Sequence, residues 1–134
     1  METYTFLLVL VASALCMSNT MPGIQTDDWK FIGDKVVNYG LDRDVIRLGD
    51  LKDDFRQIKL RVTDAPLRIF DMKIYFDNGD VQDVNIRSFI PQGGESRVID
   101  LVGGVRHLSK IEFWYKPGKK GMKGQSRVAV WGRL

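Results

Sequence analysis

From Trp29 to the end of the chain, apolar and polar residues alternate along short segments. In one clear run, Ile58, Leu60 and Val62 alternate with basic residues. A period of two sends neighbouring side chains to opposite faces of a pleated strand. The same alternation recurs across 68–76, 81–88, 109–116 and 126–132. The pattern therefore predicts an all-β chain, in which the best candidate for a helical turn is the short stretch 51–55.

Turn-forming residues separate these runs. Asp77-Asn78-Gly79 lies between two of them and predicts a tight hairpin, because Asn and Gly tolerate positive φ. Glycine pairs at 93–94 and 103–104 end two other runs. About eight strands are expected, near 30–37, 44–48, 55–63, 68–76, 81–88, 96–102, 109–116 and 126–132. Short strands with one apolar face favour an antiparallel β-sandwich, with a closed β-barrel as the alternative.

The N-terminus has a different pattern, an unbroken apolar run from Phe6 to Leu15. This run is shorter than the ~20 residues that a membrane-spanning helix needs, and it is typical of the apolar core of a secretory signal. No Lys or Arg precedes it, so an N-terminal strand or helix remains the alternative. We expect residues 1–20 to be a signal peptide and residues 27–134 to be a single domain. The expected location is secreted or periplasmic, without a later transmembrane segment.

Composition adds little about partners. The chain is 44% hydrophobic and 28% charged, with a formal net charge of +3, an ordinary balance for a globular domain. Acidic and basic residues are interspersed, whereas a nucleic-acid binder carries a denser basic stripe. Cys16, the single cysteine, lies inside the predicted signal. The mature domain is therefore expected to lack disulfides, thiol nucleophiles and cysteine-based zinc sites.

Several segments together resemble a known group of proteins. They are LDRDVI at 41–46, FRQIKL at 55–60, RVIDLVGG at 97–104, IEFWY at 111–115 and VAVWG at 128–132. In order and spacing this set is similar to short exported bacterial proteins that form an uncharacterised family, a domain of unknown function. The resemblance runs from about Trp29 to the C-terminus. It implies export and a β-sandwich, and it implies no activity.

Catalytic residue types are scarce. His107 is the only histidine, and no serine has a nucleophile-elbow context, so we predict a non-enzymatic protein without metal or cofactor. His107 itself is expected to be a surface or turn residue. Asp42 with Asp44, and Asp77 with Asp80, remain open as oxygen ligands for a hard cation. A carboxylate-based hydrolase is a further alternative, which requires two acids that face each other across a cleft.

Candidate binding residues fall outside the predicted core. Trp114, Trp131 and Tyr75 alternate with inward residues, and if they share a face they form a flat platform on which a sugar can stack. A second candidate is an anion site made by three arginines, Arg43, Arg97 and Arg106. Asp42, Arg43 and Asp44 are also interpreted as a charge network that pairs internally.

A basic loop is the last candidate. Lys116, Lys119, Lys120 and Lys123 lie close together and predict either an exposed solubilising loop or a contact with an anionic surface. Taken together, the sequence predicts an exported non-enzymatic domain that binds a ligand such as a carbohydrate or an envelope component. A structural or accessory subunit that packs against a protein partner is the alternative.

Overall fold

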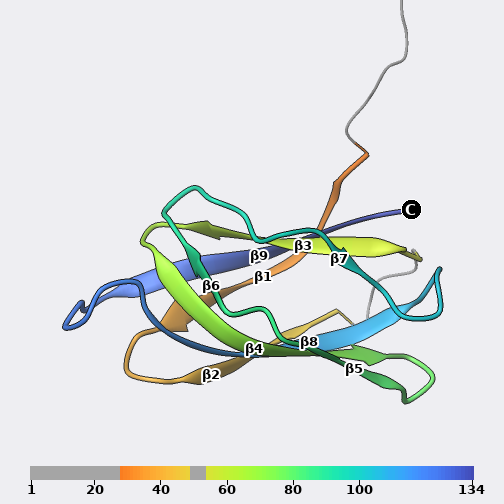
Figure 1. The fold of residues 1–134 in the computed structure, drawn as a ribbon, viewed down its shortest axis with the longest axis horizontal. Helices are drawn as coiled ribbons and strands as arrows, with labels where there is room; N and C mark the ends of the chain where they lie inside the picture. Colours follow the sequence, from red (N-terminus) through yellow and green to blue (C-terminus); the bar gives the residue numbers. More distant parts are fainter. Residues whose placement is uncertain (1–27, 49–53) are drawn as a thin grey trace, which may run out of the picture.

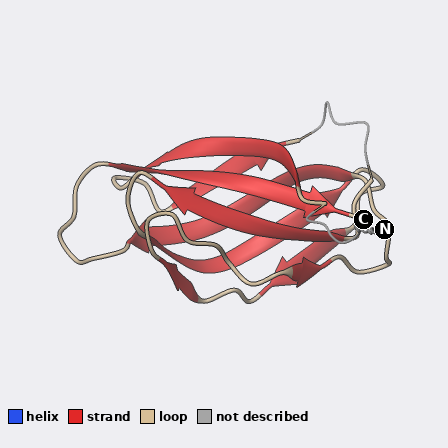
Figure 2. Cartoon of the chain, turned by 90° about the horizontal axis from the view of Figure 1, so that it is seen from above, coloured by secondary structure: helices blue, strands red, loops and turns tan. Residues whose placement is uncertain are grey.

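The computed structural model describes residues 28–48 and 54–134, and these ranges consist of strands, turns and loops without a helix (Figure 2). The strands are β1 Lys30–Asn38, β2 Arg43–Arg47, β3 Gln57–Thr63, β4 Leu67–Phe76, β5 Val81–Val84, β6 Ser88–Ile90, β7 Ile99–Asp100, β8 Leu108–Pro117 and β9 Gln125–Arg133. Within this part of the chain, no helix is long and apolar enough to cross a membrane. The predicted signal peptide and most of the predicted helical turn at 51–55 lie outside the described residues.

The strands form two antiparallel sheets that lie one above the other (Figure 1). One sheet has the order β1-β9-β3-β7, and the other has the order β2-β8-β4-β5, with β6 also paired to β4. Every strand pair in the described residues joins members of the same sheet, so the two layers remain separate. The predicted β-sandwich is thereby confirmed, and the β-barrel alternative is not adopted.

The two sheets bury the side chains that the alternating pattern assigns to the interior. Ile58, Leu60 and Val62 of β3 have exposed fractions of 0%, as do Val128 and Val130 of the neighbouring β9. Ile111, Phe113 and Tyr115 of β8 fill the opposite layer. Burying an aliphatic or aromatic side chain of this size contributes about 1.5–3 kcal/mol. The period-two pattern is therefore the main determinant of the core.

The β4–β5 hairpin forms at the predicted turn. Gly79 has a φ of 95°, a value that glycine adopts without the steric cost that a Cβ brings. The side-chain Oδ1 of Asn78 accepts a hydrogen bond from the backbone N–H of Asp80 at 3.0 Å. This local bond is the usual reason for Asn in a tight turn.

A β-bulge in β4 changes part of the predicted pattern. Ile69 is opposite Tyr115 and Asp71 is opposite Trp114, so Phe70 is an extra residue on the β4 side. Regular alternation across 68–76 predicts that Phe70 faces inward with Met72 and Ile74, and this was wrong: Phe70 is only partly buried, whereas Ile69 is fully buried. The bulge shifts the phase of alternation by one residue between the two halves of β4.

The predicted strand 81–88 is divided into β5 and β6, and both pair with β4 on either side of its bulge. Residues 85–87 leave the ladder at this point. The backbone N–H of Arg87 donates to the carbonyl of the bulged Phe70 at 3.1 Å, and Arg87 has a φ of 36°. A non-glycine residue at positive φ is strained, and such strain persists only where the surrounding structure holds it.

Candidate functional site

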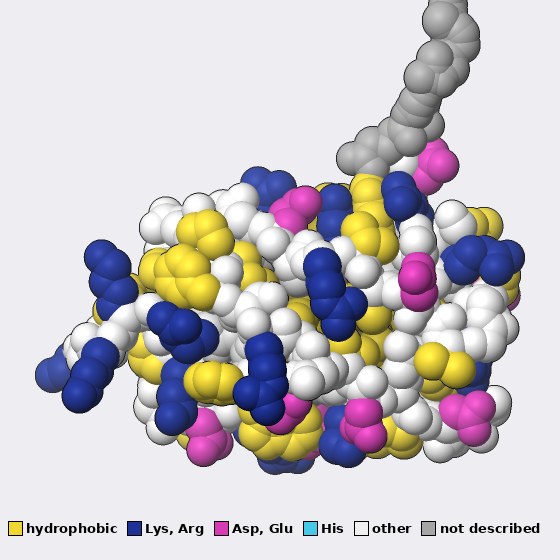
Figure 3. All heavy atoms as spheres, in the orientation of Figure 1, with side chains coloured by type: hydrophobic (Ala, Val, Ile, Leu, Met, Phe, Trp, Pro, Cys, Tyr) yellow, Lys and Arg dark blue, Asp and Glu magenta, His cyan; other side chains and the backbone are white. Residues whose placement is uncertain are grey.

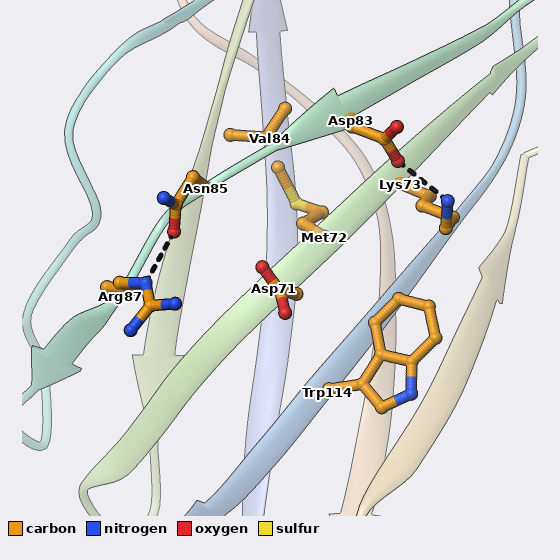
Figure 4. A pocket seen from close by; sticks show the side chains of 8 residues that line it. All are labelled: Asp71, Met72, Lys73, Asp83, Val84, Asn85, Arg87 and Trp114. Atoms are coloured by element: carbon orange, nitrogen blue, oxygen red, sulfur yellow. Dashed lines mark hydrogen bonds and ion pairs between the residues drawn. The ribbon is translucent and has the colours of Figure 1, made fainter.

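A hollow of about 550 Å³ opens on the outer face of the five-stranded sheet. It lies beside the β4 bulge, where residues 85–87 run between β5 and β6 (Figure 4). Its lining consists of Asp71, Met72, Lys73, Asp83, Val84, Asn85, Arg87 and Trp114. This volume falls within the range of about 300–1,000 Å³ that is usual for small-molecule sites.

The strand register explains how these residues meet. Trp114 of β8 is opposite Asp71 of β4, and Lys73 of β4 is opposite Asp83 of β5. Figure 4 shows the indole of Trp114 on one side of β4 and the polar side chains of Asp83 and Asn85 on the other. The hollow therefore has an aromatic side and a polar side, supplied by three neighbouring strands.

The charged groups of the hollow are balanced, and three of them form hydrogen bonds. Lys73 Nζ donates to Asp83 Oδ1 at 2.7 Å, and Arg87 Nε donates to Asn85 Oδ1 at 2.8 Å. The hydrogen bond to Asp83 and its negative charge raise the pKa of Lys73 above the ordinary value. Asp71 adds a second carboxylate, so two acids face two bases. The site thus offers donors and acceptors without a strong net charge.

A polar network supports the same face next to the hollow. Glu112 of β8 is opposite Lys73 and has an exposed fraction of only 7%. Its carboxylate accepts a hydrogen bond from Nε of Arg43 and another from the hydroxyl of Tyr75 at 2.9 Å. Burial by itself raises the pKa of Glu112, but the bonds from Arg43 and Tyr75 outweigh it and lower the pKa. The hydrogen bond to Glu112 in turn raises the pKa of the Tyr75 phenol. At neutral pH, Tyr75 therefore stays protonated and Glu112 stays ionised, which keeps the hydrogen bond between them.

Two of the three predicted platform aromatics share this face, and the third does not. Trp114 and Tyr75 belong to β8 and β4 of the five-stranded sheet, whereas Trp131 belongs to β9 of the other sheet. A single platform of all three was therefore a wrong prediction. Trp131 instead packs edge-to-face against Phe31 of β1, with ring centroids 5.6 Å apart. Alternation predicted that all three point outward, but it contains no information on which sheet each strand joins.

The three predicted arginines do not converge on one anion site. Arg43 is paired with Glu112, as described above. Arg106 holds the β4–β5 hairpin, since its Nη2 donates to Asp80 Oδ2 at 2.9 Å and its guanidinium lies 3.8 Å from the ring centroid of Phe76. Arg97 lies in the segment between β6 and β7, where its side chain is exposed. An anion site made jointly by these arginines was a wrong prediction.

The predicted charge network at 42–44 is observed in part. Besides the bond from Arg43 to Glu112, Asp44 lies 3.6 Å from Lys35 Nζ and accepts a hydrogen bond from the Tyr115 hydroxyl at 3.2 Å. Burial, followed by the negative charge of Asp44, raises the pKa of Tyr115 far above the ordinary value. These contacts connect β2 with β1 and β8, so the short charged segment stabilises strand positions.

His107 has more specific surroundings than expected for a surface residue. Its two ring nitrogens lie 3.1 Å from Asp54 Oδ1 and 3.1 Å from Asp77 Oδ2. The His107 ring thus connects Asp54, which precedes β3, with Asp77 of the β4–β5 hairpin. Within residues 28–48 and 54–134, no group of three His, Cys, Asp or Glu side chains is arranged to hold a metal ion.

The polar lining of the hollow was missed by sequence reasoning as a site. Asp71, Lys73, Asp83, Asn85 and Arg87 were predicted only as outward-facing members of two alternating runs. Their alternation was a correct signal for the face that they occupy. Their convergence on Trp114 depends on β4 lying between β8 and β5, and on the bulge that frees residues 85–87.

These observations define the class of protein, an antiparallel β-sandwich domain with a polar hollow beside a tryptophan on one outer face. Comparison with known families then identifies the chain more closely. Residues 5–132 match the family described as "Domain of unknown function (DUF2541)", and the chain belongs to this family. The resemblance noted in the sequence is thereby confirmed. Comparison with curated proteins gave no match.

A solved structure shares the fold. The chain is similar to part of AlgX from Pseudomonas aeruginosa, with a TM-score of 0.53 and 16% sequence identity. The similarity covers 78% of this chain but only 26% of AlgX, so the chain corresponds to about a quarter of that protein. At this level of identity the similarity concerns the fold, and fold alone does not define function.

Proposed function

We propose that this chain is an exported, non-enzymatic module that binds a saccharide in the hollow beside Trp114. The observation that carries the proposal is the combination of one indole with five planar or charged polar side chains in a hollow of about 550 Å³. The C–H face of a sugar ring packs on an aromatic ring, while its hydroxyl groups need paired donors and acceptors. Asp71, Asp83, Asn85 and Arg87 supply such groups from β4 and from the segment that begins with β5.

The carboxylates with shifted pKa values support a binding role over a hydrolytic one. The pKa values of Glu112 and Asp80 are both lowered by hydrogen bonds, from Arg43 and Tyr75 in the first case and from Asn78 and Arg106 in the second. A glycosidase needs a carboxyl whose pKa is raised so that it can donate a proton. Within the hollow, Asp83 forms an ion pair with Lys73.

The binding proposal is tested by a matched pair of tryptophan variants. The purified mature domain is screened on a glycan array, and the affinity for the strongest glycan is then measured by calorimetry. We expect Trp114→Ala to weaken binding at least tenfold, which corresponds to about 1.4 kcal/mol. Trp131→Ala, on the other sheet, is the control and should bind as the unmodified protein does. Equal affinity in the Trp114→Ala variant contradicts the proposal.

Export is tested separately, because the apolar run from Phe6 to Leu15 lies outside the described residues. We expect the full-length chain, expressed in a bacterium, to be recovered from the periplasm or medium with a new N-terminus near residue 20. N-terminal sequencing gives the result directly. Recovery only of an uncleaved protein from the cytoplasm overturns the export proposal and leaves the binding proposal intact.

A further inference from the structure

A second hollow lies on the same sheet, at the end where β8 leads into the β8–β9 loop. Its volume is about 450 Å³, and four of its seven lining residues carry a positive charge. The charged residues are Arg68 of β4, Lys116 of β8, and Lys119 and Lys120 of the loop. Figure 3 shows dark-blue side chains gathered at the left end of the molecule, where this loop lies in Figure 1.

This basic hollow continues the face that carries Trp114. Lys116 is two residues beyond Trp114 on β8, so both side chains point outward, separated by about 7 Å along the strand. Arg68 is opposite Lys116 in the register and opposite Phe89 of β6 on its other side. A ligand that packs against Trp114 and extends by about 7 Å along β8 therefore reaches the side chains of Lys116 and Arg68.

The positive charge of this hollow is not neutralised within the protein. Arg68, Lys116, Lys119 and Lys120 form no ion pair with any residue that the structure describes. In the neighbouring Trp114 hollow, by contrast, Lys73 is paired with Asp83 at 2.7 Å. Unpaired cations that line a concave surface attract and orient an anionic group.

Aromatic side chains hold the two strand cations in place. The Arg68 guanidinium lies 5.4 Å from the ring centroid of Phe89, and Lys116 Nζ lies 5.6 Å from that of Phe70. Contacts of this kind restrict a long side chain without neutralising its charge. Phe70 is the residue that the β4 bulge moves away from the core, so the bulge supplies the ring that Lys116 contacts.

We infer that the ligand of the Trp114 hollow is an acidic saccharide, whose carboxylate, phosphate or sulfate group lies among Arg68, Lys116, Lys119 and Lys120. This inference rests on the proposed saccharide-binding function and adds the charge of the ligand. The planar fork of Arg68 suits two oxygens of such a group, and the three lysines add charge around it. The sugar ring itself occupies the balanced Trp114 hollow.

The experiment uses a glycan array on which uronic-acid, phosphorylated and sulfated oligosaccharides are printed beside uncharged counterparts of similar length. The mature domain is compared with Arg68→Gln/Lys116→Gln and with Arg97→Gln, a control at an exposed arginine outside the hollow. We expect the unmodified domain to prefer acidic glycans at least tenfold. The double variant should lose this preference and keep its thermal stability, whereas Arg97→Gln should retain it.

The outcomes separate the inference from the function on which it rests. Strong signals on uncharged glycans, or a double variant that keeps its preference for acidic ones, overturn the inference and leave the saccharide-binding proposal standing. No signal on any glycan overturns both. Binding of the domain to vesicles of phosphatidylglycerol, lost in the double variant and without any glycan signal, overturns the inference in favour of a lipid surface.

Discussion

The outer faces of the two sheets present the same residue types in different arrangements. Each carries a tryptophan at an outward position, Trp114 on β8 and Trp131 on β9. Beside Trp114 the sheet opens into a hollow of about 550 Å³, whereas the space beside Trp131 is only about 140 Å³. A bulge alone does not make this difference, because β1 also has one beside Trp131, between Phe31 and Gly33. On the Trp114 face, the gap between β5 and β6 adds to the bulge in β4. Trp114 is thus a binding candidate because residues 85–87 leave the strand ladder and line the hollow beside it.

The surroundings of Trp131 indicate a structural role. Phe31 packs against its edge, and Lys59 is held nearby by Glu95, whose Oε1 lies 3.1 Å from the lysine Nζ. The same Lys59 and Arg133 of β9 each lie 4.4 Å from the ring centroid of Trp29. The indole Nε1 of Trp131 is buried and has no hydrogen-bond partner among the described residues. This face is largely closed by its own side chains.

Both outer faces belong to sheets that share one core, and the largest expected effect tests this shared core. Phe113 has an exposed fraction of 0% and lies at the centre of β8, opposite Asp44 and Met72. We expect Phe113→Ala to lower the free energy of unfolding by about 3–5 kcal/mol through lost burial and a cavity. Urea unfolding followed by circular dichroism and by tryptophan fluorescence measures this change, and the two transitions should coincide.

As a control, Phe31→Ala removes an aromatic ring that is 47% exposed on the four-stranded sheet. Its effect on stability should be clearly smaller than that of Phe113→Ala. Separate transitions for the two probes, or equal costs for the two variants, contradict the picture of one shared core.

The second prediction concerns the tryptophans themselves. We expect Trp131→Ala to lower the free energy of unfolding by about 1–3 kcal/mol, because packing against Phe31 and partial burial are both lost. Trp114→Ala should cost less, since one side of this indole faces the hollow. Urea unfolding of both variants gives the order directly. If Trp114→Ala proves the more destabilising of the two, Trp114 is a structural residue and the contrast between the faces fails.

The smallest expected effect concerns the dependence of stability on pH. The pKa of Glu112 is lowered below its ordinary value of 4.5 by Arg43 and Tyr75, so its ionised form stabilises the folded state above that value. This contribution is lost as the pH falls from about 4.5 through the lower folded-state pKa. We therefore expect Glu112→Gln to flatten the decrease in melting temperature over this acidic range. Thermal unfolding at pH steps from about 6 to 2.5 measures it.

Glu95→Gln is the matched control for this measurement, because the Glu95 carboxylate also accepts a hydrogen bond from a cation, Lys59, but is exposed and lies beside the other sheet. Its profile should follow that of the unmodified protein more closely than the Glu112→Gln profile does. Identical profiles for the Glu112→Gln variant and the unmodified protein contradict a stabilising role for the buried carboxylate.

The sequence by itself determined the class of fold and the orientation of most side chains. Alternation at Ile58, Leu60 and Val62 is a local property, because the pleat of a strand sends neighbouring residues to opposite faces whatever lies beside it. The hairpin at Asn78 and Gly79 is also a local property, because the hydrogen bond to the Asn78 side chain and the φ value of Gly79 define it. Family membership also followed from the order of short segments along the chain.

Only the tertiary structure decided which outward residues meet. Trp114 lies near Lys73 and Asp83 because β8 pairs with β4 and β4 with β5, contacts between segments that are distant in the sequence. The bulge at Phe70 was equally hidden, because the adjacent apolar residues Ile69 and Phe70 do not themselves show which of the two faces the core. Strand pairing and bulges depend on the energy of the whole packed sandwich, whereas the alternation depends on one strand at a time.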